Sequence, residues 1–185
     1  LPIYGRKVLP GFNSLADKYP DIAKMWSKRN RFSADQVLPN INIATWTCPT
    51  CHGNYSARII DVINDEVDCP YCNDRKVLPG FNSLAVKHPD IAKMWSKQNW
   101  LSADQVLPNT NMVTWTCPTC HGDYSARIIE VINGEAECPY CNNKKLLSGF
   151  NSLADKYPDI VNLWSDQNEL SPNQVLPNTT IATWT

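Results

Sequence analysis

The sequence predicts a tandem array of small α+β modules. Three observations predict it: an internal repeat, alternating helix and strand signals in each copy, and cysteines in regularly spaced pairs. Residues 8–76 align without a gap with residues 77–145, with 54 identities in 69 positions, and a partial third copy spans residues 146–185. We expect three domains with these bounds. The third lacks its cysteines, and we expect its helices to pack on the second. We also expect the chain to be a segment of a larger protein.

The first half of each copy predicts short helices. In the first copy, Pro10-Gly11 marks a turn. Residues 13–18 and 20–26 then read as two helices, the second with proline in its first turn. Residues 33–36 have the Ser-x-x-Gln spacing of a capping box, which recurs in both other copies.

The second half of each copy predicts strands. Residues 43–47 and 55–63 are β-prone, and Asn133-Gly134 in the second copy signals a hairpin turn. The predicted core is small and consists of Leu15, Ile22, Trp26 and Trp46. A core of this size rarely stabilises about 70 residues alone, so we expect a further cross-link.

Composition and charge exclude several classes of protein. The chain is 43% hydrophobic and 19% charged, which is typical of a folded domain. No apolar run approaches the roughly 18 residues of a membrane-spanning helix. With 17 Lys and Arg against 18 Asp and Glu, the chain cannot coat nucleic acid by bulk charge, although a local basic face stays open.

The cysteines form four Cys-x-x-Cys pairs, two in each complete copy, with 17 residues between the pairs: Cys48, Cys51, Cys69, Cys72, Cys117, Cys120, Cys138 and Cys141. A two-residue spacing lets one tight loop turn two sulfurs inward. Two such loops supply four thiolates to a closed tetrahedral zinc ion. Because the metal binds only the folded state, it stabilises a domain with a small core. We predict two structural zinc ions.

Three other roles for the cysteines fit less well. Disulfides rarely adopt this layout, and a thioredoxin-type redox pair needs a βαβ pattern that is absent here. The haem-attachment pattern Cys-x-x-Cys-His ends at His52 and His121, but the later cysteine pairs, each followed by Asn, would then have no role. We expect these histidines to hydrogen-bond beside the cysteines or to replace Cys51 and Cys120 as ligands.

The motifs around the cysteines also resemble a known family. They are Trp-Thr-Cys-Pro-Thr-Cys, an aromatic residue four positions later (Tyr55 and Tyr124), Cys-Pro-Tyr-Cys, and an Asn-Ser-Leu-Ala lead-in that closes at a repeated Asn. This combination resembles the probable zinc-ribbon family of tandem treble-clef domains. The resemblance implies treble-clef or zinc-ribbon-like modules, each with short helices, a β-hairpin and a four-cysteine zinc site. Where the family often places an Arg after the hairpin, this sequence has Val62 and Val131.

The same resemblance implies a binding module for nucleic acid, and some members are fused to endonuclease-like domains of the very-short-patch-repair type. We expect this array to be the intracellular DNA-targeting segment of a larger protein, with double-stranded DNA as the favoured ligand. A protein-interaction or spacer array is the alternative. No Ser/His/Asp arrangement, phosphate-binding Gly loop or acidic cluster is present, and four thiolates leave zinc no open position, so we expect no catalysis in this segment.

Candidate nucleic-acid contacts lie after the second helix, on the hairpin and after the last cysteine pair: Arg29, Arg31, Arg58, Arg75, Lys76, Gln98, Trp100, Arg127, Lys144 and Lys145. Positions 29 and 31 vary among the copies, becoming Gln98 and Trp100 in the second, and they flank an Asn found in all three. We therefore hypothesise that this segment faces the ligand, with Arg or Gln reading a base edge and Trp100 stacking on a base.

Overall fold

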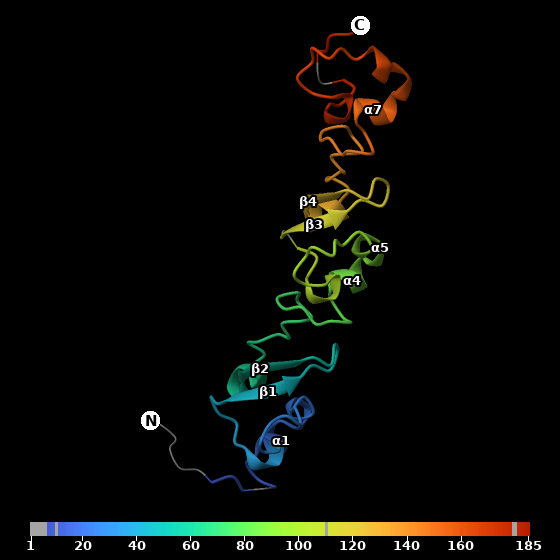
Figure 1. The fold of residues 1–185 in the computed structure, drawn as a ribbon. Coiled ribbons are helices and arrows are strands. Elements are labelled where there is room, and N and C mark those ends of the chain that lie inside the picture. The colour runs from blue at the N-terminus through green and yellow to red at the C-terminus, as the bar shows by residue number, and fades with distance from the viewer. Residues whose placement is uncertain (1–6, 10, 110, 179–180) are drawn as a thin grey trace. The chain divides into compact units, whose positions relative to one another are not determined.

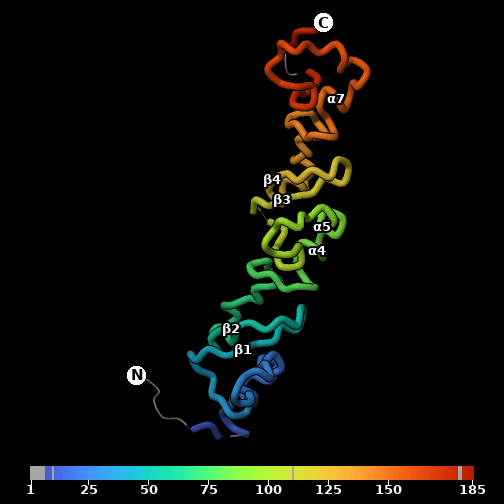
Figure 2. Tube along the Cα trace, in the orientation of Figure 1, coloured from blue at the N-terminus to red at the C-terminus, as the bar shows by residue number. Residues whose placement is uncertain are grey.

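The computed structural model describes residues 7–9, 11–109, 111–178 and 181–185, and the chain divides into two compact units (Figure 1; Figure 2). The first unit, residues 1–82, holds the first sequence copy and the start of the next. The second unit, residues 83–185, holds the rest of the second copy and the third. The compact units therefore divide six residues beyond the end of the first sequence repeat.

The first copy begins with two single-turn helices, α1 (Leu15–Lys18) and α2 (Pro20–Ala23). Ser14 caps α1, because its hydroxyl oxygen accepts a hydrogen bond from the amide of Asp17 at 3.1 Å. Helix α2 is shorter than predicted: the chain leaves it at Lys24, and Trp26 pairs with Trp46 in a β-bridge. In the predicted turn before α1, Gly11 has a φ of 81°, while Pro10 lies outside the described residues.

A two-stranded antiparallel sheet follows the 3-10 helix η1 (Ala34–Gln36). Strands β1 (Ile43–Thr47) and β2 (Asn54–Arg58) pair with Trp46 opposite Tyr55. The predicted second strand is correct only as far as Arg58, since the next residues form helix α3 (Ile59–Ile63). Ile59 and Val62 are buried at a spacing of three, which is a helical period and not the alternation of a strand.

The second copy repeats these elements as α4 (Leu84–Lys87), α5 (Pro89–Ala92), η2 (Ala103–Gln105), β3 (Met112–Thr116), β4 (Asp123–Arg127) and α6 (Ile128–Ile132). The predicted hairpin turn at Asn133-Gly134 is wrong. Asn133 ends α6, and Gly134 has a φ of 72°, the left-handed conformation that often follows a helix. The predicted capping boxes are confirmed in all three copies.

In its described residues, the third copy repeats the first half of this arrangement: α7 (Leu153–Lys156) and the 3-10 helices η3 (Pro158–Leu163) and η4 (Pro172–Gln174). Helix α7 packs mainly against η3 and η4 of its own copy. The expected packing of these helices on the second copy stays a prediction. Among the described residues, no helix is long and apolar enough to cross a membrane.

The core of each complete copy is built around two tryptophans and one leucine. In the first copy, Leu15 and Trp46 are fully buried, and the ring of Trp26 stands edge-on to Trp46 with ring centres 5.3 Å apart. Ile22 is partly buried against them, so the predicted core is confirmed. Leu84 and Trp115 hold the same places in the second copy.

A buried asparagine ties the end of each cysteine-containing half to the start of the next sequence copy. In the second unit, the side-chain amide of Asn151 donates to the carbonyls of Tyr140 at 2.8 Å and Lys145 at 2.9 Å, and its oxygen accepts from the amide of Leu147 at 2.7 Å. Asn82 makes the equivalent bonds within the first unit. These bonds explain why the compact unit extends past the sequence repeat.

Candidate metal centres and binding surface

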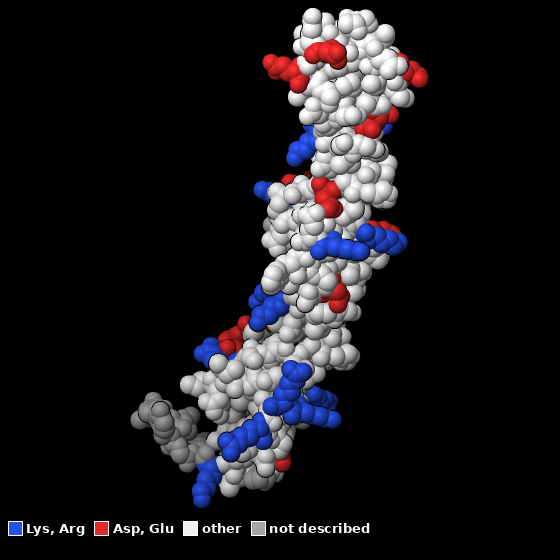
Figure 3. Space-filling view, viewed as in Figure 1, with Lys and Arg blue, Asp and Glu red and all other residues white. Residues whose placement is uncertain are grey.

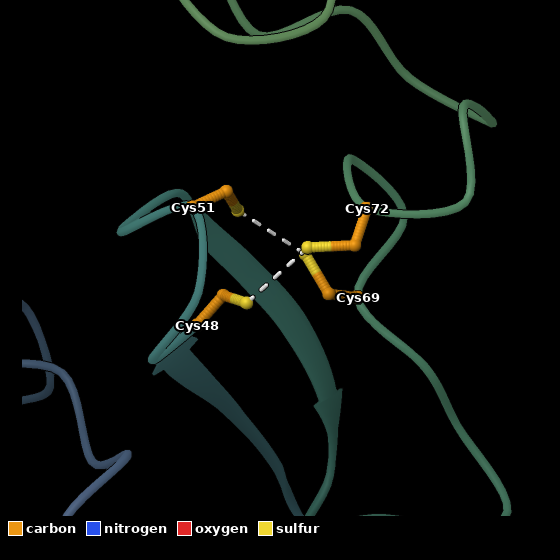
Figure 4. A group of neighbouring side chains, drawn as sticks. All are labelled: Cys48, Cys51, Cys69 and Cys72. Atoms are coloured by element: carbon orange, nitrogen blue, oxygen red, sulfur yellow. Dashed lines mark hydrogen bonds between the residues drawn. The ribbon is translucent and has the colours of Figure 1, made fainter.

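The first cysteine pair of each copy sits in the loop that connects the two strands. In the first copy, Cys48 directly follows β1, its amide donates to the carbonyl of Gly53 at 2.9 Å, and its carbonyl accepts from the amide of His52 at 3.0 Å. His52 has a φ of 58°, so the loop turns sharply back into β2. The side chains of Cys48 and Cys51 point toward those of Cys69 and Cys72 (Figure 4).

The second cysteine pair lies in a separate turn after α3, and it packs directly on the first loop. The ring of Tyr71 covers Gly53 so closely that a Cβ atom there would lie 2.6 Å from the ring. The hydroxyl of Tyr71 also donates to the carbonyl of Asn54 at 2.8 Å. Gly122 and Tyr140 repeat this contact in the second copy. The two cysteine loops are therefore held together by contacts besides those of the thiols.

The four sulfurs of each copy converge on one point, as Figure 4 shows for the first copy. All four lie within 4.8 Å of one another, with Cys48 and Cys72 3.6 Å apart and Cys51 and Cys69 3.5 Å apart. The corresponding distances in the second copy are 3.7 Å and 3.5 Å. A tetrahedron with zinc–sulfur bonds of about 2.3 Å has edges of about 3.8 Å.

All eight cysteines are free thiols, because a disulfide would bring two sulfurs to about 2.05 Å. Spacing and donor chemistry together give two four-cysteine groups suited to hold two zinc ions. His52 and His121 are exposed, and neither belongs to the clusters, which have four ligands without them. They are therefore not the alternative ligands that the sequence suggested.

The first cysteine of each cluster lies in surroundings that favour the thiolate. Burial opposes ionisation of Cys48 most strongly, but hydrogen bonds from the amides of Cys51 and Thr50 outweigh it and lower its pKa to about 7. Cys117 has the same surroundings, and its pKa is also lowered to about 7. Burial, followed by the charges of the nearby cysteines, raises the pKa of Tyr55 to about 12. Amide donors of this kind stabilise the charged form that binds metal.

Comparison with known families identifies these modules. A family model described as a probable treble clef zinc finger domain matches residues 22–75 and 91–144, and each match contains one complete four-cysteine cluster. The two matches cover more than half of the chain. The chain belongs to this family. No curated protein matches the chain. The predicted family, the α+β fold and the zinc sites are thus confirmed.

Each of the three copies carries a loop held at several points, which we call the anchored loop: residues 27–32, 96–101 and, in the third copy, 165–170. Asn30 donates to the carbonyl of Thr45 at 2.7 Å and accepts from its amide at 2.8 Å. The indole nitrogen of Trp26 donates to the carbonyl of Phe32 at 2.8 Å. Equivalent bonds fix the other two loops. The repeated Asn is therefore an anchor, and the variable residues flank it.

The structure separates the candidate nucleic-acid contacts into two groups. Arg58, Arg75 and Arg127 each face a carboxylate, at 2.8 Å, 3.6 Å and 3.9 Å respectively. The other cations are exposed, and none forms an ion pair with a residue that the structure describes: Arg29, Arg31, Lys76, Lys144 and Lys145. Val62 and Val131, which replace the Arg often found in the family, are buried.

The anchored loop of the second copy differs in its contacts. The side-chain amide of Gln98 donates to the carboxylate of Asp123 on β4 at 2.7 Å, while Trp100 is 98% exposed. In the first copy, Arg29 stands in place of Gln98 and Asn54 in place of Asp123. Both positions change together between the copies, which is the sequence signal that could have revealed the Gln98–Asp123 contact.

Proposed function

We propose that this chain is a zinc-stabilised treble clef array that binds nucleic acid, with double-stranded DNA as the favoured ligand. We also propose that the chain acts inside the cell as the targeting segment of a larger protein. The anchored loop of the first copy carries the proposal: Lys28, Arg29 and Arg31 are exposed there and have no ion-pair partner among the described residues.

Three exposed cations on a fixed loop, without ion pairs among the described residues, suit contacts with phosphate. Arg presents several N–H donors in a plane that matches phosphate geometry, and a loop already held by Asn30 loses little conformational freedom on binding. In Figure 3, Lys and Arg side chains gather over the first unit, whereas the end of the second unit that holds the third copy shows mainly Asp and Glu. The third copy has one Lys against four acidic residues. The proposed contact surface therefore centres on the first copy.

The zinc sites have a structural role in this proposal. Four thiolates fill the coordination sphere of zinc, which leaves no position for an activated water. Any catalytic activity of the larger protein would therefore belong to another of its parts.

Fluorescence anisotropy of the zinc-loaded chain with duplex DNA, single-stranded DNA and RNA, over a series of salt concentrations, tests the proposal. We expect binding to duplex DNA that weakens steeply with salt. The Arg29→Ala and Arg31→Ala variants should each reduce the salt slope by about 0.9, the value of one lost phosphate contact. Arg58→Ala is the matched control, because this side chain already faces Asp61, and its slope should stay close to that of the unmodified chain.

A protein-interaction or spacer array is the second candidate, and exposed apolar side chains favour it. Ile41 and Ile43 in the first copy and Met112 in the second are more than half exposed. Absence of binding to every nucleic acid at low salt would contradict the first proposal and support this one.

A further inference from the structure

Trp100 combines a fixed backbone with an almost fully exposed ring. The side chain of the preceding residue, Asn99, donates to the carbonyl of Thr114 at 2.7 Å and accepts from the amide of Thr114 at 2.9 Å. The carbonyl of its following residue, Leu101, accepts from the indole of Trp95 at 2.8 Å. Tryptophan is highly buried on average in folded proteins. A ring that is 98% exposed between two anchored residues is therefore well placed to contact a ligand.

The same position differs in chemistry among the three copies. It is Arg31 in the first copy, where the guanidinium lies 5.3 Å from the ring centre of Phe32, and Glu169 in the third. In the second copy the side chain of Gln98 is already hydrogen-bonded to Asp123. Of the two residues that flank Asn99, Trp100 is therefore the one whose side chain is open to a ligand. The two complete copies thus present different groups from one scaffold: cations in the first and a flat aromatic ring in the second.

The residues around Trp100 favour a nucleic-acid base over an apolar protein surface. The three residues before it are Lys97, Gln98 and Asn99, so the loop on that side is polar. Leu101 is partly exposed, but Phe32 and Leu170 are exposed to a similar degree in the other copies, so this residue does not distinguish the second loop. An exposed flat ring on the same loop as Lys97 matches a base together with its phosphate.

We propose that Trp100 stacks on an unpaired base, so that the second copy makes affinity depend on single-stranded nucleotides adjoining a duplex. This inference rests on the proposed nucleic-acid binding. A base inside a duplex has both faces covered by its neighbours, whereas an unpaired base at the end of a duplex has a free face for the indole. Stacking of this kind accepts any base, so we expect a preference for unpaired nucleotides without a strong sequence preference.

The test uses the zinc-loaded chain and two DNA probes with the same duplex, one blunt-ended and one with a single-stranded thymidine extension. The unmodified chain should bind the extended probe more tightly. Trp100→Ala should weaken binding to that probe by about 5- to 150-fold, the effect of losing one stacked base, and should leave the blunt probe nearly unchanged. Trp100→Phe, which keeps an aromatic face, should retain most of the preference.

Met112→Ala is the matched control, since it removes another exposed apolar side chain from the same copy and should change neither affinity. Equal affinity of the unmodified chain and Trp100→Ala for the extended probe, with salt-dependent binding intact, would overturn this inference and leave the proposed function standing. Absence of salt-dependent binding to both probes would overturn both proposals. Because Trp100 is exposed, its substitution should leave the unfolding transition unchanged, which thermal unfolding verifies.

Discussion

The second and third copies share the same first half, but only the second copy continues into a hairpin and cysteine loops. Both pair two tryptophans edge-to-face, at 5.5 Å for Trp95 and Trp115 and at 5.3 Å for Trp164 and Trp184. Trp115 is nevertheless completely buried, whereas Trp184 is 45% exposed. The comparison shows that the first half forms the tryptophan pair, while the hairpin and the cysteine loops cover it.

The contacts of Trp115 show how this cover is built. Its indole nitrogen donates to the carbonyl of Ala126 on the second strand at 3.2 Å, and Tyr124 of the same strand lies opposite it. The cysteine cluster links the loop between the two strands to the last turn, because Cys117 directly follows β3 and Cys141 lies in that turn. Zinc and the tryptophan core are therefore expected to stabilise each other.

The largest effect should follow from breaking one cluster. Cys141→Ser should leave one zinc per chain in place of two and should unfold the second copy, since metal binding supplies on the order of 10 kcal/mol in small zinc domains. Zinc content by elemental analysis and near-ultraviolet circular dichroism would measure this. Cys141→His, which keeps a metal ligand, is the control and should retain the second ion. Two bound zinc ions in Cys141→Ser would contradict the prediction.

The next largest effect should come from the buried tryptophan. Trp115→Ala should destabilise the zinc-loaded chain by about 3–5 kcal/mol, because it removes a fully enclosed ring. Trp184→Ala is the matched substitution in the third copy and should cost less than about 2 kcal/mol, because much of that ring is already in water. Denaturant unfolding of both variants measures the difference. Equal losses would show that the cysteine-containing half adds nothing to the tryptophan core.

The asparagine that joins the second and third copies should have an intermediate effect. Asn151→Ala should cost about 2–3 kcal/mol, because the backbone groups of Tyr140, Lys145 and Leu147 lose a fully buried partner. Limited proteolysis should then cleave more readily near this junction. Asn13→Ala is the control, since the bonds of Asn13 among the residues that the structure describes are to exposed groups of Lys7 and Leu9, and its cost should be smaller.

The smallest effect concerns the first helix of each copy. In the first copy, Ser14 and Asp17 form a capping box, but the second copy has Val86 in place of the Asp, and Ser83 donates instead to Asp104 at 2.7 Å. Ser14→Ala should cost about 1 kcal/mol. Val86→Asp should raise the stability of the second copy by less than that amount, as measured by thermal unfolding. A fall in stability on Val86→Asp would mean that the hydrogen bond from Ser83 to Asp104 stabilises the second copy more than a capping box between Ser83 and residue 86 does.

Local patterns made the zinc sites and the first half of each copy predictable. The Cys-x-x-Cys spacing, Pro20 and the Ser-x-x-Gln boxes each act within a few residues, and all are found as expected. The predicted strand over residues 55–63 was too long, because Ile59-Ile60-Asp61-Val62-Ile63 suits a helix as well as a strand. Asn133-Gly134 was misread because a glycine with positive φ serves the end of a helix as well as a hairpin turn; here Asn133 keeps a helical backbone and only Gly134 is left-handed.

Long-range contacts leave little signal in a single sequence. The contact of Gln98 with Asp123, 25 positions away, is marked only by the joint change of both positions between the copies. The bond from Asn151 to the turn that contains the preceding cysteine pair has no such mark. Whether a given cation has a carboxylate partner also depends on the fold. Arg58 pairs with Asp61, whereas Arg29 forms no ion pair with a residue that the structure describes.

Each complete copy is a treble clef domain with a four-cysteine group suited to hold zinc. Native mass spectrometry of the unmodified chain, purified without added metal, tests zinc binding by these groups most directly. We predict a mass that corresponds to the chain with eight reduced cysteines and two zinc ions, and no species with more than two tightly bound ions. A metal-free chain with its cysteines oxidised to disulfides would contradict this account.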